Sequence, residues 1–365
     1  MRTAPTRYLY TVTNDTKQNG VAVLGQNVDG SLTEVAGSPF SAGGKGLSGG
    51  DIDQQGAIRV HDLYVLAVNP GSDSIAVFHK GDGGRLTPVA GSPFPSGGST
   101  PLSLTVHTNL VYVANQAAEF AKPKPSSPPN IVCFRISNRG KLTPVPTATI
   151  NFPAGYGPAQ VEFNPKGEIL AVTSGFQDDA TTNLHVYKVQ MDGALKEGPG
   201  SPIHTAGASG SVGFSWNPEG NRVYVSNSFG DAVTVFDVDK STGGVKQVGN
   251  IYKTHGTAPC WTVLSSDGKT LYVANFISNS ISVFDVHADG ELIRLGTAKR
   301  RGATDPDTKD LVLSKEGKFL YAVGSGRRNI SIFSIGANRK LTELPKDKSP
   351  LKLRAGKNIL GLATD

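Results

Sequence analysis

The chain has 365 residues, of which 18% are charged and 7% aromatic, with 44 glycines and 23 prolines. This abundance of turn-forming residues, without a sustained apolar pattern at helical period, excludes a mainly helical protein. No run of about 18 apolar residues is present, which excludes a transmembrane helix. The net charge of +6 is spread along the chain without arginine-rich tracts, so we expect no nucleic-acid partner, whereas a small anionic ligand is compatible.

The first residues, MRTAPTRYLYTV, lack the apolar core of a signal peptide. We therefore expect a cytoplasmic protein, with a secreted or periplasmic location left open if a leader has been removed. Cys133 and Cys260 lie far apart in the sequence and form neither a disulfide framework nor a metal-binding cluster. We expect both to be buried as small apolar residues.

Taken in chain order, one short strand recurs about every 50 residues and ends in a small or polar residue. Its copies are YTVTN (10–14), LAVN (66–69), VYVAN (111–115), ILAVT (169–173), VYVSN (223–227), LYVAN (271–275) and LYAVG (320–324). Each copy is followed by a second strand such as VAVL at 21 or IAVF at 75, and then by an edge-like strand such as LTEV or LTPV. A further strand precedes each following unit, so each unit has four antiparallel strands.

The phrase LTEVAGSPF (32–40) returns as LTPVAGSPF (86–94), and GPGSPI (198–203) is a weaker copy. We expect the phrase to lie after the outermost strand, where the chain turns back toward the next innermost strand. Glycine and proline supply the sharp turn. No helix follows the phrase, which excludes a phosphate-binding loop.

Seven four-stranded units at this period predict an all-β fold, a seven-bladed β-propeller with four antiparallel strands per blade, forming a single domain over residues 1–365. The chain begins in the second strand of a blade, and AGKNILGLATD at the C-terminus supplies the missing innermost strand. We therefore expect the N- and C-terminal strands to share one blade and close the ring.

The YVAN and YVSN strands, the VxVF-type strands, the Leu-Thr edge strands and the AGSPF links resemble the seven-bladed β-propeller lactonase family. That family includes 6-phosphogluconolactonase and fungal carboxy-muconate cyclase. The resemblance covers essentially the whole chain and implies opening or closing of a lactone at the mouth of the central channel. Where the resemblance leads us to expect a histidine-containing stretch before an innermost strand, this chain has GPAQ (157–160), so no family catalytic residue is transferred.

The innermost strands carry polar residues at positions that we align with one another: Arg59, Thr105, Glu162 and Ser215, against Val263 and Val312. A charge on an innermost strand is costly unless it is paired or solvated. Arg59 and Glu162 are therefore our first catalytic candidates, with pairing to a neighbouring strand or to water as the structural alternative.

Two unusual linking segments precede innermost strands. GDIDQQG (50–56) offers Asp51, Asp53 and Gln55 as substrate-binding residues, or forms a hydrogen-bonded Asx turn. ATDPDTKD (303–310) offers Asp307 and Asp310 as catalytic acids or bases beside Lys309. Its carboxylates also suit Ca²⁺, but the glycine and terminal glutamate of an EF-hand are missing, and we expect no metal or other cofactor.

The remaining candidates follow the same reasoning about loops held by a rigid scaffold. His255 is a candidate proton shuttle. Gln160, Trp261, Lys309 and Arg327 are candidate substrate-binding residues. The proline-rich stretch from 115 to 130 is a candidate lid, a partner contact or a disordered loop.

These observations favour a lactonase-like enzyme, a lactone hydrolase or cycloisomerase, acting on a small anionic lactone. A non-catalytic propeller that binds a ligand or protein, and an isomerase or cyclase of a specialised metabolite, remain as alternatives. We expect a monomer without a membrane or nucleic-acid partner.

Overall fold

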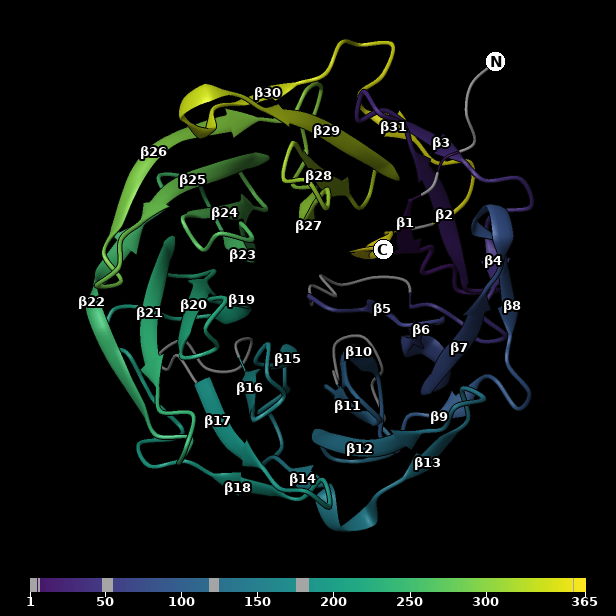
Figure 1. Ribbon diagram of the computed structural model, residues 1–365, viewed down its shortest axis with the longest axis vertical. Helices are drawn as coiled ribbons and strands as arrows, with labels where there is room; N and C mark the ends of the chain where they lie inside the picture. Colours follow the sequence, from purple (N-terminus) through teal and green to yellow (C-terminus); the bar gives the residue numbers. More distant parts are fainter. Residues whose placement is uncertain (1–4, 6, 48–54, 118–124, 175–183, 357) are drawn as a thin grey trace.

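Seven antiparallel sheets radiate around a common centre in the computed structural model, which describes residues 5, 7–47, 55–117, 125–174, 184–356 and 358–365 (Figure 1). Each sheet contains a path of four strands that runs outward from the centre. The all-β, seven-bladed propeller expected from the sequence is therefore confirmed. Within the described ranges, the helices are 3-10 turns of three residues, and none of them could cross a membrane.

The strands fall into four concentric sets. The innermost are β32 (Leu360–Thr364), β5 (Ile58–His61), β10 (Pro101–His107), β15 (Gln160–Phe163), β19 (Ser211–Trp216), β23 (Pro259–Leu264) and β27 (Thr308–Leu313). The second are β1 (Tyr8–Val12), β6 (Tyr64–Asn69), β11 (Leu110–Asn115), β16 (Ile169–Thr173), β20 (Arg222–Asn227), β24 (Thr270–Asn275) and β28 (Phe319–Gly324).

The third set and the outermost set complete the blades. The third are β2 (Gly20–Gln26), β7 (Ser74–Lys80), β12 (Asn130–Ile136), β17 (Leu184–Val189), β21 (Ala232–Val238), β25 (Ser280–Val286) and β29 (Asn329–Ile335). The outermost are β3 (Leu32–Glu34), β8 (Leu86–Pro88), β13 (Leu142–Pro144), β18 (Leu195–Glu197), β22 (Val245–Lys253), β26 (Leu292–Lys299) and β30 (Leu341–Glu343). Shorter outer pieces are β4 (Phe40–Ser41), β9 (Phe94–Pro95), β14 (Ile150–Asn151) and β31 (Leu351–Lys352), and the 3-10 turns are Pro70–Ser72, Asp82–Gly84, Pro146–Ala148 and Ala337–Arg339.

The second and third strands are apolar along most of their length because each sheet is covered on both faces by its neighbours. In β11 every residue is buried, and in β7 the first five of seven are. The apolar clusters accordingly join residues of adjacent blades, as Tyr112 of β11 joins Phe163 of β15 at a ring-centroid distance of 5.3 Å. The core is thus a set of layers between blades.

The two chain ends share one blade, as expected. Strand β32 pairs with β1 in antiparallel register, with Leu9 opposite Thr364 and Tyr10 opposite Ala363. Asp365 strengthens this contact through its side chain. Its carboxylate accepts hydrogen bonds from the Tyr8 amide at 2.7 Å and from the Tyr10 hydroxyl at 2.9 Å.

The repeated AGSPF phrase follows the outermost strand, as expected, but the chain pairs once more with the third strand before it leaves the blade. The chain turns at Gly37, and Phe40 then pairs again with the third strand at Val21. At the break the Ser38 hydroxyl accepts the Val23 amide at 2.9 Å, so the serine replaces a strand partner. The same bond at the same 2.9 Å distance recurs from Val77 to Ser92, from Val186 to Ser201 and from Ile332 to Ser349.

A second repeated device joins consecutive blades. The residue before a third strand has left-handed backbone and accepts hydrogen bonds from amides that precede or begin the next innermost strand. Asp73 accepts the Thr100 amide at 2.8 Å, Asp231 accepts the Ala258 amide at 2.8 Å, and Asn279 accepts the Thr308 amide at 3.1 Å. These linking segments and the turns between second and third strands therefore share one face, which we call the link face.

Removal of residues 359–365 should destabilise the whole ring, because β1 loses its inner partner and the buried side chains of Ile359, Leu360 and Leu362 are lost. We expect the free energy of unfolding to fall by at least about 5 kcal/mol, measured by urea denaturation. If the truncated chain does not fold, Leu360→Ala is expected to cost about 2–4 kcal/mol. A truncated protein that unfolds at the same urea concentration as the full chain would refute the closure.

Candidate functional site

Among the described residues, the edge of each innermost strand that faces the ring centre has no further strand beside it (Figure 1). Backbone amides and carbonyls on such an edge need other partners. Register shifts occur where several of these strands begin, between Pro101 and Ser103, Ser211 and Phe214, Pro259 and Trp261, and Thr308 and Leu311. Bulges of this kind redirect side chains and backbone groups toward a site.

Two predicted substrate-binding glutamines satisfy this exposed edge. The Gln160 side-chain amide donates to the Phe214 carbonyl at 3.1 Å and accepts the Phe214 amide at 2.7 Å. Gln55 does the same with Thr262, donating at 2.6 Å and accepting at 3.1 Å. Because β5 and β23 lie on opposite sides of the ring centre, the Gln55 bonds cross it (Figure 1). Both glutamines therefore hold the scaffold of the site.

The structure brings the two first catalytic candidates together. Nη2 of Arg59 lies 3.2 Å from Oε1 of Glu162, and Nε of Arg59 donates to the Leu104 carbonyl at 3.1 Å. The other carboxylate oxygen of Glu162 accepts the Gln160 amide at 2.6 Å. Nη2 of Arg59 is buried and makes no hydrogen bond with any described residue, so its contact with Glu162 is an ion pair without a hydrogen bond.

Solvent reaches this pair. The side chains of Arg59 and Glu162 are 24% and 27% exposed, whereas the neighbouring Asp310 is 2% exposed. Gly56 allows the guanidinium to lie close to the backbone, because a Cβ there would be 2.9 Å from Nη2 of Arg59, and its φ is +86°. The pair is therefore a fixed donor and acceptor at the solvent-accessible ring centre.

Glu162 does not share the strand position of Arg59, which corrects the sequence alignment. Arg59 is opposite Leu66, and Thr105 and Ser215 are opposite the corresponding Tyr112 and Tyr224. Glu162 is opposite Ala171, one residue nearer the link face. β15 pairs with β16 without a register shift, as β5 does with β6, whereas β10, β19, β23 and β27 each shift by one residue.

Asp310 lies beside this pair as a buried carboxyl. Its oxygens accept the Leu311 amide at 2.8 Å and the Leu362 amide at 2.9 Å, so it also ties β27 to the closing strand β32. Burial raises the pKa of Asp310 to about 7, although the two amides and the positive charge of Arg59 act in the opposite direction. The charge state of Asp310 therefore affects the electrostatic environment of Arg59 and Glu162, although Asp310 itself is out of contact with bulk water.

Asp307 belongs to a separate buried ion pair. Its Oδ2 lies 3.4 Å from Nη1 of Arg300, and its Oδ1 accepts the Gly326 amide at 2.6 Å. Arg300 also donates to Asn329 at 2.5 Å and to Ser331 at 3.0 Å. Burial lowers the pKa of Arg300, and the negative charge of Asp307 acts in the opposite direction.

The Arg300 guanidinium fills a space that an asparagine occupies elsewhere. Strands β6, β11, β20 and β24 end in an asparagine whose amide donates to nearby residues, whereas β28 ends in Gly324. A Cβ on Gly324 would meet Arg300, Asn329 and Asp307. Glycine at an otherwise asparagine position was the sequence signal for this ion pair, and our sequence analysis did not use it.

The other candidates lie on the link face or beneath it. His255 is exposed in the segment between β22 and β23. Trp261 and Lys309 are buried, and both lie against Phe276. The ring centroids of Trp261 and Phe276 are 6.5 Å apart. Nζ of Lys309 lies 5.3 Å from the centroid of the Phe276 ring. Arg327 is bound to the Gly302 carbonyl at 2.6 Å.

Two candidates, Asp51 and Asp53, fall outside the described residues. Within the described ranges no group of three or more histidine, cysteine, aspartate or glutamate residues is arranged to hold a metal ion. Both cysteines are buried, as expected.

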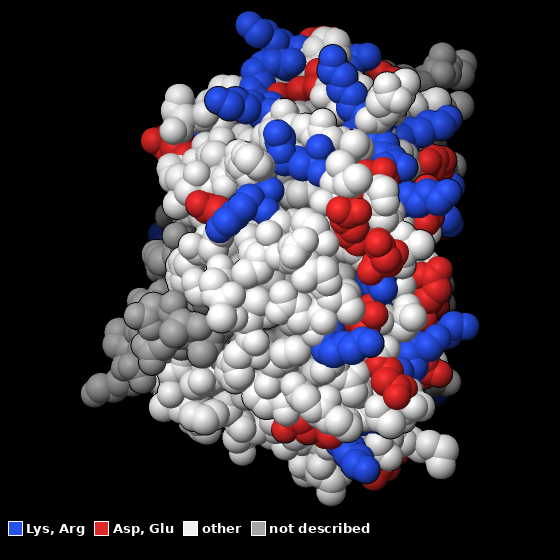
Figure 2. Space-filling view, turned by 90° about the vertical axis from the view of Figure 1, so that its left-hand side faces the viewer, with Lys and Arg blue, Asp and Glu red and all other residues white. Residues whose placement is uncertain are grey.

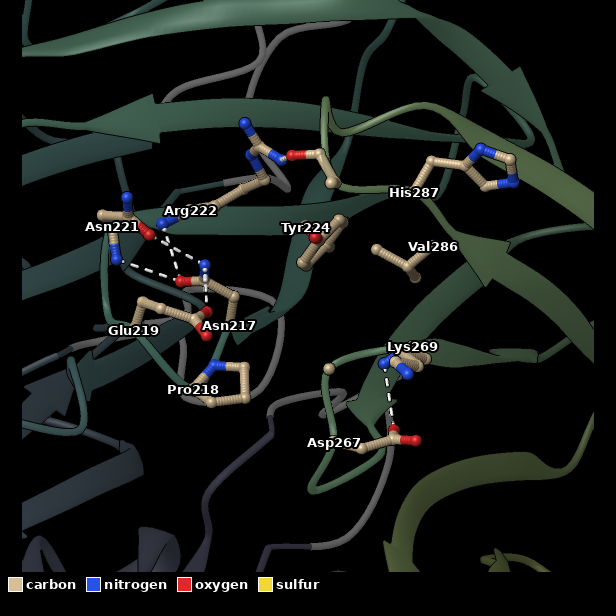
Figure 3. Close-up of a pocket in the computed structure, with 12 residues that line it drawn as sticks. Asn217, Pro218, Glu219, Asn221, Arg222, Tyr224, Asp267, Lys269, Val286 and His287 are labelled. Carbon is tan, nitrogen blue, oxygen red and sulfur yellow. Dashed lines mark hydrogen bonds between the residues drawn. The ribbon is translucent and has the colours of Figure 1, made fainter.

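A polar pocket of about 380 Å³ lies between the blades of β20 and β24, at the end of the innermost strands opposite the link face (Figure 3). Its polar groups are largely engaged with one another. Asn217 accepts the Arg222 amide at 2.9 Å and donates to Glu219 at 2.8 Å, and Arg222 pairs with Asp237 at 2.6 Å. A pocket of the same position lies between β2 and β28, lined by Gln26 and Tyr321 among others. Because the polar groups of the first pocket are engaged with one another, we place the functional site at the ring centre.

The outer side of the ring near β22 carries charges of both signs. Figure 2 shows acidic and basic side chains interspersed along one margin and a broad uncharged area in the middle. The described residues in this view form no continuous basic surface of the kind that follows a nucleic-acid backbone.

Residues 129–261 and 262–352 match the family model described as lactonase, 7-bladed beta-propeller. The chain belongs to this family. A search of curated protein sequences gives no match.

Solved structures share the fold over nearly the full length. A protein from Lactobacillus plantarum is 20% identical with a TM-score of 0.76, covering 98% of this chain and 99% of that one. A proposed 6-phosphogluconolactonase from Bacteroides fragilis is 18% identical with a TM-score of 0.75, covering 100% and 99%. The periplasmic gluconolactonase of Pseudomonas aeruginosa is 16% identical with a TM-score of 0.72, covering 97% and 99%. At these identities the likeness establishes the fold.

Gly324→Ala should break the Arg300–Asp307 pair, because the added methyl group takes the space of the guanidinium. Separating a buried ion pair costs about 3–5 kcal/mol, and we expect a loss of that size in urea denaturation. Gly296→Ala is the matched control, since nothing lies within 4 Å of its added Cβ. Equal stability of the two variants would show that the pair is unimportant for folding.

Asp310 should make stability depend on pH. The unfolded carboxyl ionises near pH 3.8 and the folded one near pH 7, so the folded protein binds more protons between these values. The contribution of Asp310 to stability therefore falls as pH rises from about 4 to 7, by at most about 1.4 kcal/mol per pH unit. In urea denaturation, the advantage of the wild type over Asp310→Asn should be larger at pH 5 than at pH 8. An equal advantage at both values would show that the carboxyl ionises normally.

Proposed function

We propose that the protein opens small anionic lactones at the ring centre, with Arg59 and Glu162 as the catalytic pair. The observation that carries this proposal is their contact at 3.2 Å on two innermost strands where solvent reaches both. Membership of the lactonase family and the names of the similar structures support the reaction class.

The chemistry follows from the groups present. A water molecule adds to the lactone carbonyl carbon while the Glu162 carboxylate takes its proton. The negative charge that develops on the carbonyl oxygen is stabilised by the positive charge of the Arg59 guanidinium, whose side chain is 24% exposed. The ring C–O bond then breaks, and the proton held by Glu162 passes to the leaving alkoxide. The product is a hydroxy acid, which releases a proton at neutral pH.

The surrounding groups position this pair. Gln160 holds the second oxygen of Glu162 and is itself fixed by two bonds to the Phe214 peptide. Asp310 adds negative charge near Arg59 when it is ionised. The arginine also offers a site for the anionic group of the substrate or product. The isomerase or cyclase alternative uses the same pair without net hydrolysis.

The test is acid release in a pH-stat over phosphorylated, sugar, aliphatic and aromatic lactones, corrected for spontaneous hydrolysis. We expect saturable turnover of at least one lactone by the wild type. Glu162→Gln and Arg59→Ala should each lower kcat by about 100-fold or more while the thermal unfolding temperature changes little. Gly296→Ala serves as the folded control. Undiminished turnover in both variants would reject this pair as the catalytic groups, and no turnover of any lactone would favour a binding function.

A further inference from the structure

A cavity of about 370 Å³ lies on the outer wall of the ring, between β26 and the turn that precedes β30 of the next blade (Figure 1). Its walls are Val283 of β25, residues 295–298 of β26 and residues 338–341 of the next blade. The innermost strands, which carry Arg59 and Glu162, contribute none of these residues. The cavity is therefore separate from the ring centre.

A bulge in β26 turns one apolar side chain toward this cavity. The register of β25 and β26 shifts between Val283 and Phe284, which leaves Leu295 as an extra residue without a partner on β25. Bulges redirect side chains in this way. Leu295 lines the cavity and is 45% exposed. A Cβ on the next residue, Gly296, would meet no atom within 4 Å, so the space beside Leu295 is open.

The facing wall is a turn in which an arginine takes the place of a glycine. In each blade, the turn between the third and outermost strands contains a residue with left-handed backbone. In six blades this residue is a glycine, namely Gly30, Gly84, Gly140, Gly193, Gly243 and Gly290. In the seventh it is Arg339, with a φ of +59°, and Asn338 before it has a φ of +55°. Such backbone is unfavourable for a residue with a Cβ, and it is retained mainly where a site requires it.

The cavity carries positive charge without an acidic residue in its lining. Arg339 and Lys340 are among the lining residues, whereas aspartate and glutamate are not. The Arg339 guanidinium is held by Asp285 of the preceding blade, and Lys340 forms no ion pair with a described residue. Arg294 and Lys299 add two exposed cations on β26. The charge of this region therefore favours an anion.

We propose that this cavity binds a small organic acid with an apolar body. The body packs against Leu295, Ala298 and Leu341, and the carboxylate pairs with Lys340 and Arg339. Sites for small molecules have volumes of about 300–1,000 Å³ and combine apolar walls with a few polar groups, as this cavity does. The inference concerns a second site and does not rest on the proposed function.

Two other occupants are less compatible with this surface. An added peptide strand needs a regular free edge, and the bulge at Leu295 and a charged edge residue such as Arg294 are features that discourage strand addition. A second copy of the chain, bound about a two-fold axis, brings the same surface of both copies together. The cations around Lys340 then face one another and repel.

The probes are 4-phenylbutanoate and 4-phenylbutanamide, which share one apolar body and differ in charge. In calorimetric titration of the full chain at pH 7, we expect 4-phenylbutanoate to bind with a Kd below about 1 mM and the amide to bind about two- to fivefold more weakly. Leu295→Ser should weaken binding of the acid about three- to tenfold. Ile293→Ser is the matched control, because Ile293 is on the same strand and 44% exposed but does not line the cavity.

Two further variants test the space and the charge separately. Gly296→Leu fills the cavity and should abolish binding of both probes, while the open surroundings of Gly296 allow the variant to fold. Lys340→Gln should weaken binding of the acid about two- to fivefold and leave binding of the amide unchanged. Lys315→Gln, at an exposed lysine outside the cavity, should bind both probes like the wild type. Thermal unfolding confirms that each variant is folded.

The inference is overturned if the wild type shows no saturable binding of 4-phenylbutanoate, or if Leu295→Ser and Ile293→Ser bind it equally well. Self-association of the wild type that Leu295→Ser removes, without binding of either probe, would assign the surface to a second copy and also overturn the inference. Lactone turnover at the ring centre should be the same in Leu295→Ser and Ile293→Ser. The proposed function and this inference can therefore fail independently.

Discussion

The unpaired edges of the seven innermost strands are the constraint on which the centre of this protein depends. A sheet edge that is not covered by another strand must find hydrogen-bond partners or remain in water. Here the side chains of Gln55, Gln160 and Asp310 supply much of what is missing, each by two bonds to backbone groups. The polar character of the ring centre is therefore first a requirement of the fold.

Against that requirement, Arg59 and Glu162 differ from their neighbours. They bond to the scaffold, and Nη2 of Arg59 is buried, yet both side chains as a whole remain partly accessible. If every polar side chain at a propeller centre is hydrogen-bonded to the backbone, no hydrogen-bonding group remains to bind a ligand. This residual accessibility distinguishes a candidate catalytic pair from the structural polar groups around it.

The ion pair of Arg300 and Asp307 illustrates the opposite case. Both side chains are almost fully buried, and their remaining bonds go to Ser331, Asn329 and backbone amides. Its geometry resembles a catalytic acid beside a cation, but Arg300 follows the outermost strand of one blade and bonds to Asn329 and Ser331 of the next. Burial and complete hydrogen bonding thus separate a structural ion pair from a reactive one.

The sequence by itself determined the blade count, the strand order within a blade and the closure of the ring, because these follow from a repeated pattern of short buried strands. It also selected Arg59 and Glu162, since a charge on an innermost strand needs a partner. It could not place Glu162, because the register of each innermost strand leaves no clear mark in the residue pattern: β5 and β15 pair regularly, whereas β10, β19, β23 and β27 shift by one residue. Nor could it separate Asp307, which is bound to Arg300, from Asp310, which lies beside Arg59. Only the tertiary structure decided these points, because distances between blades depend on register and on side chains that reach across the ring, and the chain separates Gln55 from Thr262 by most of its length.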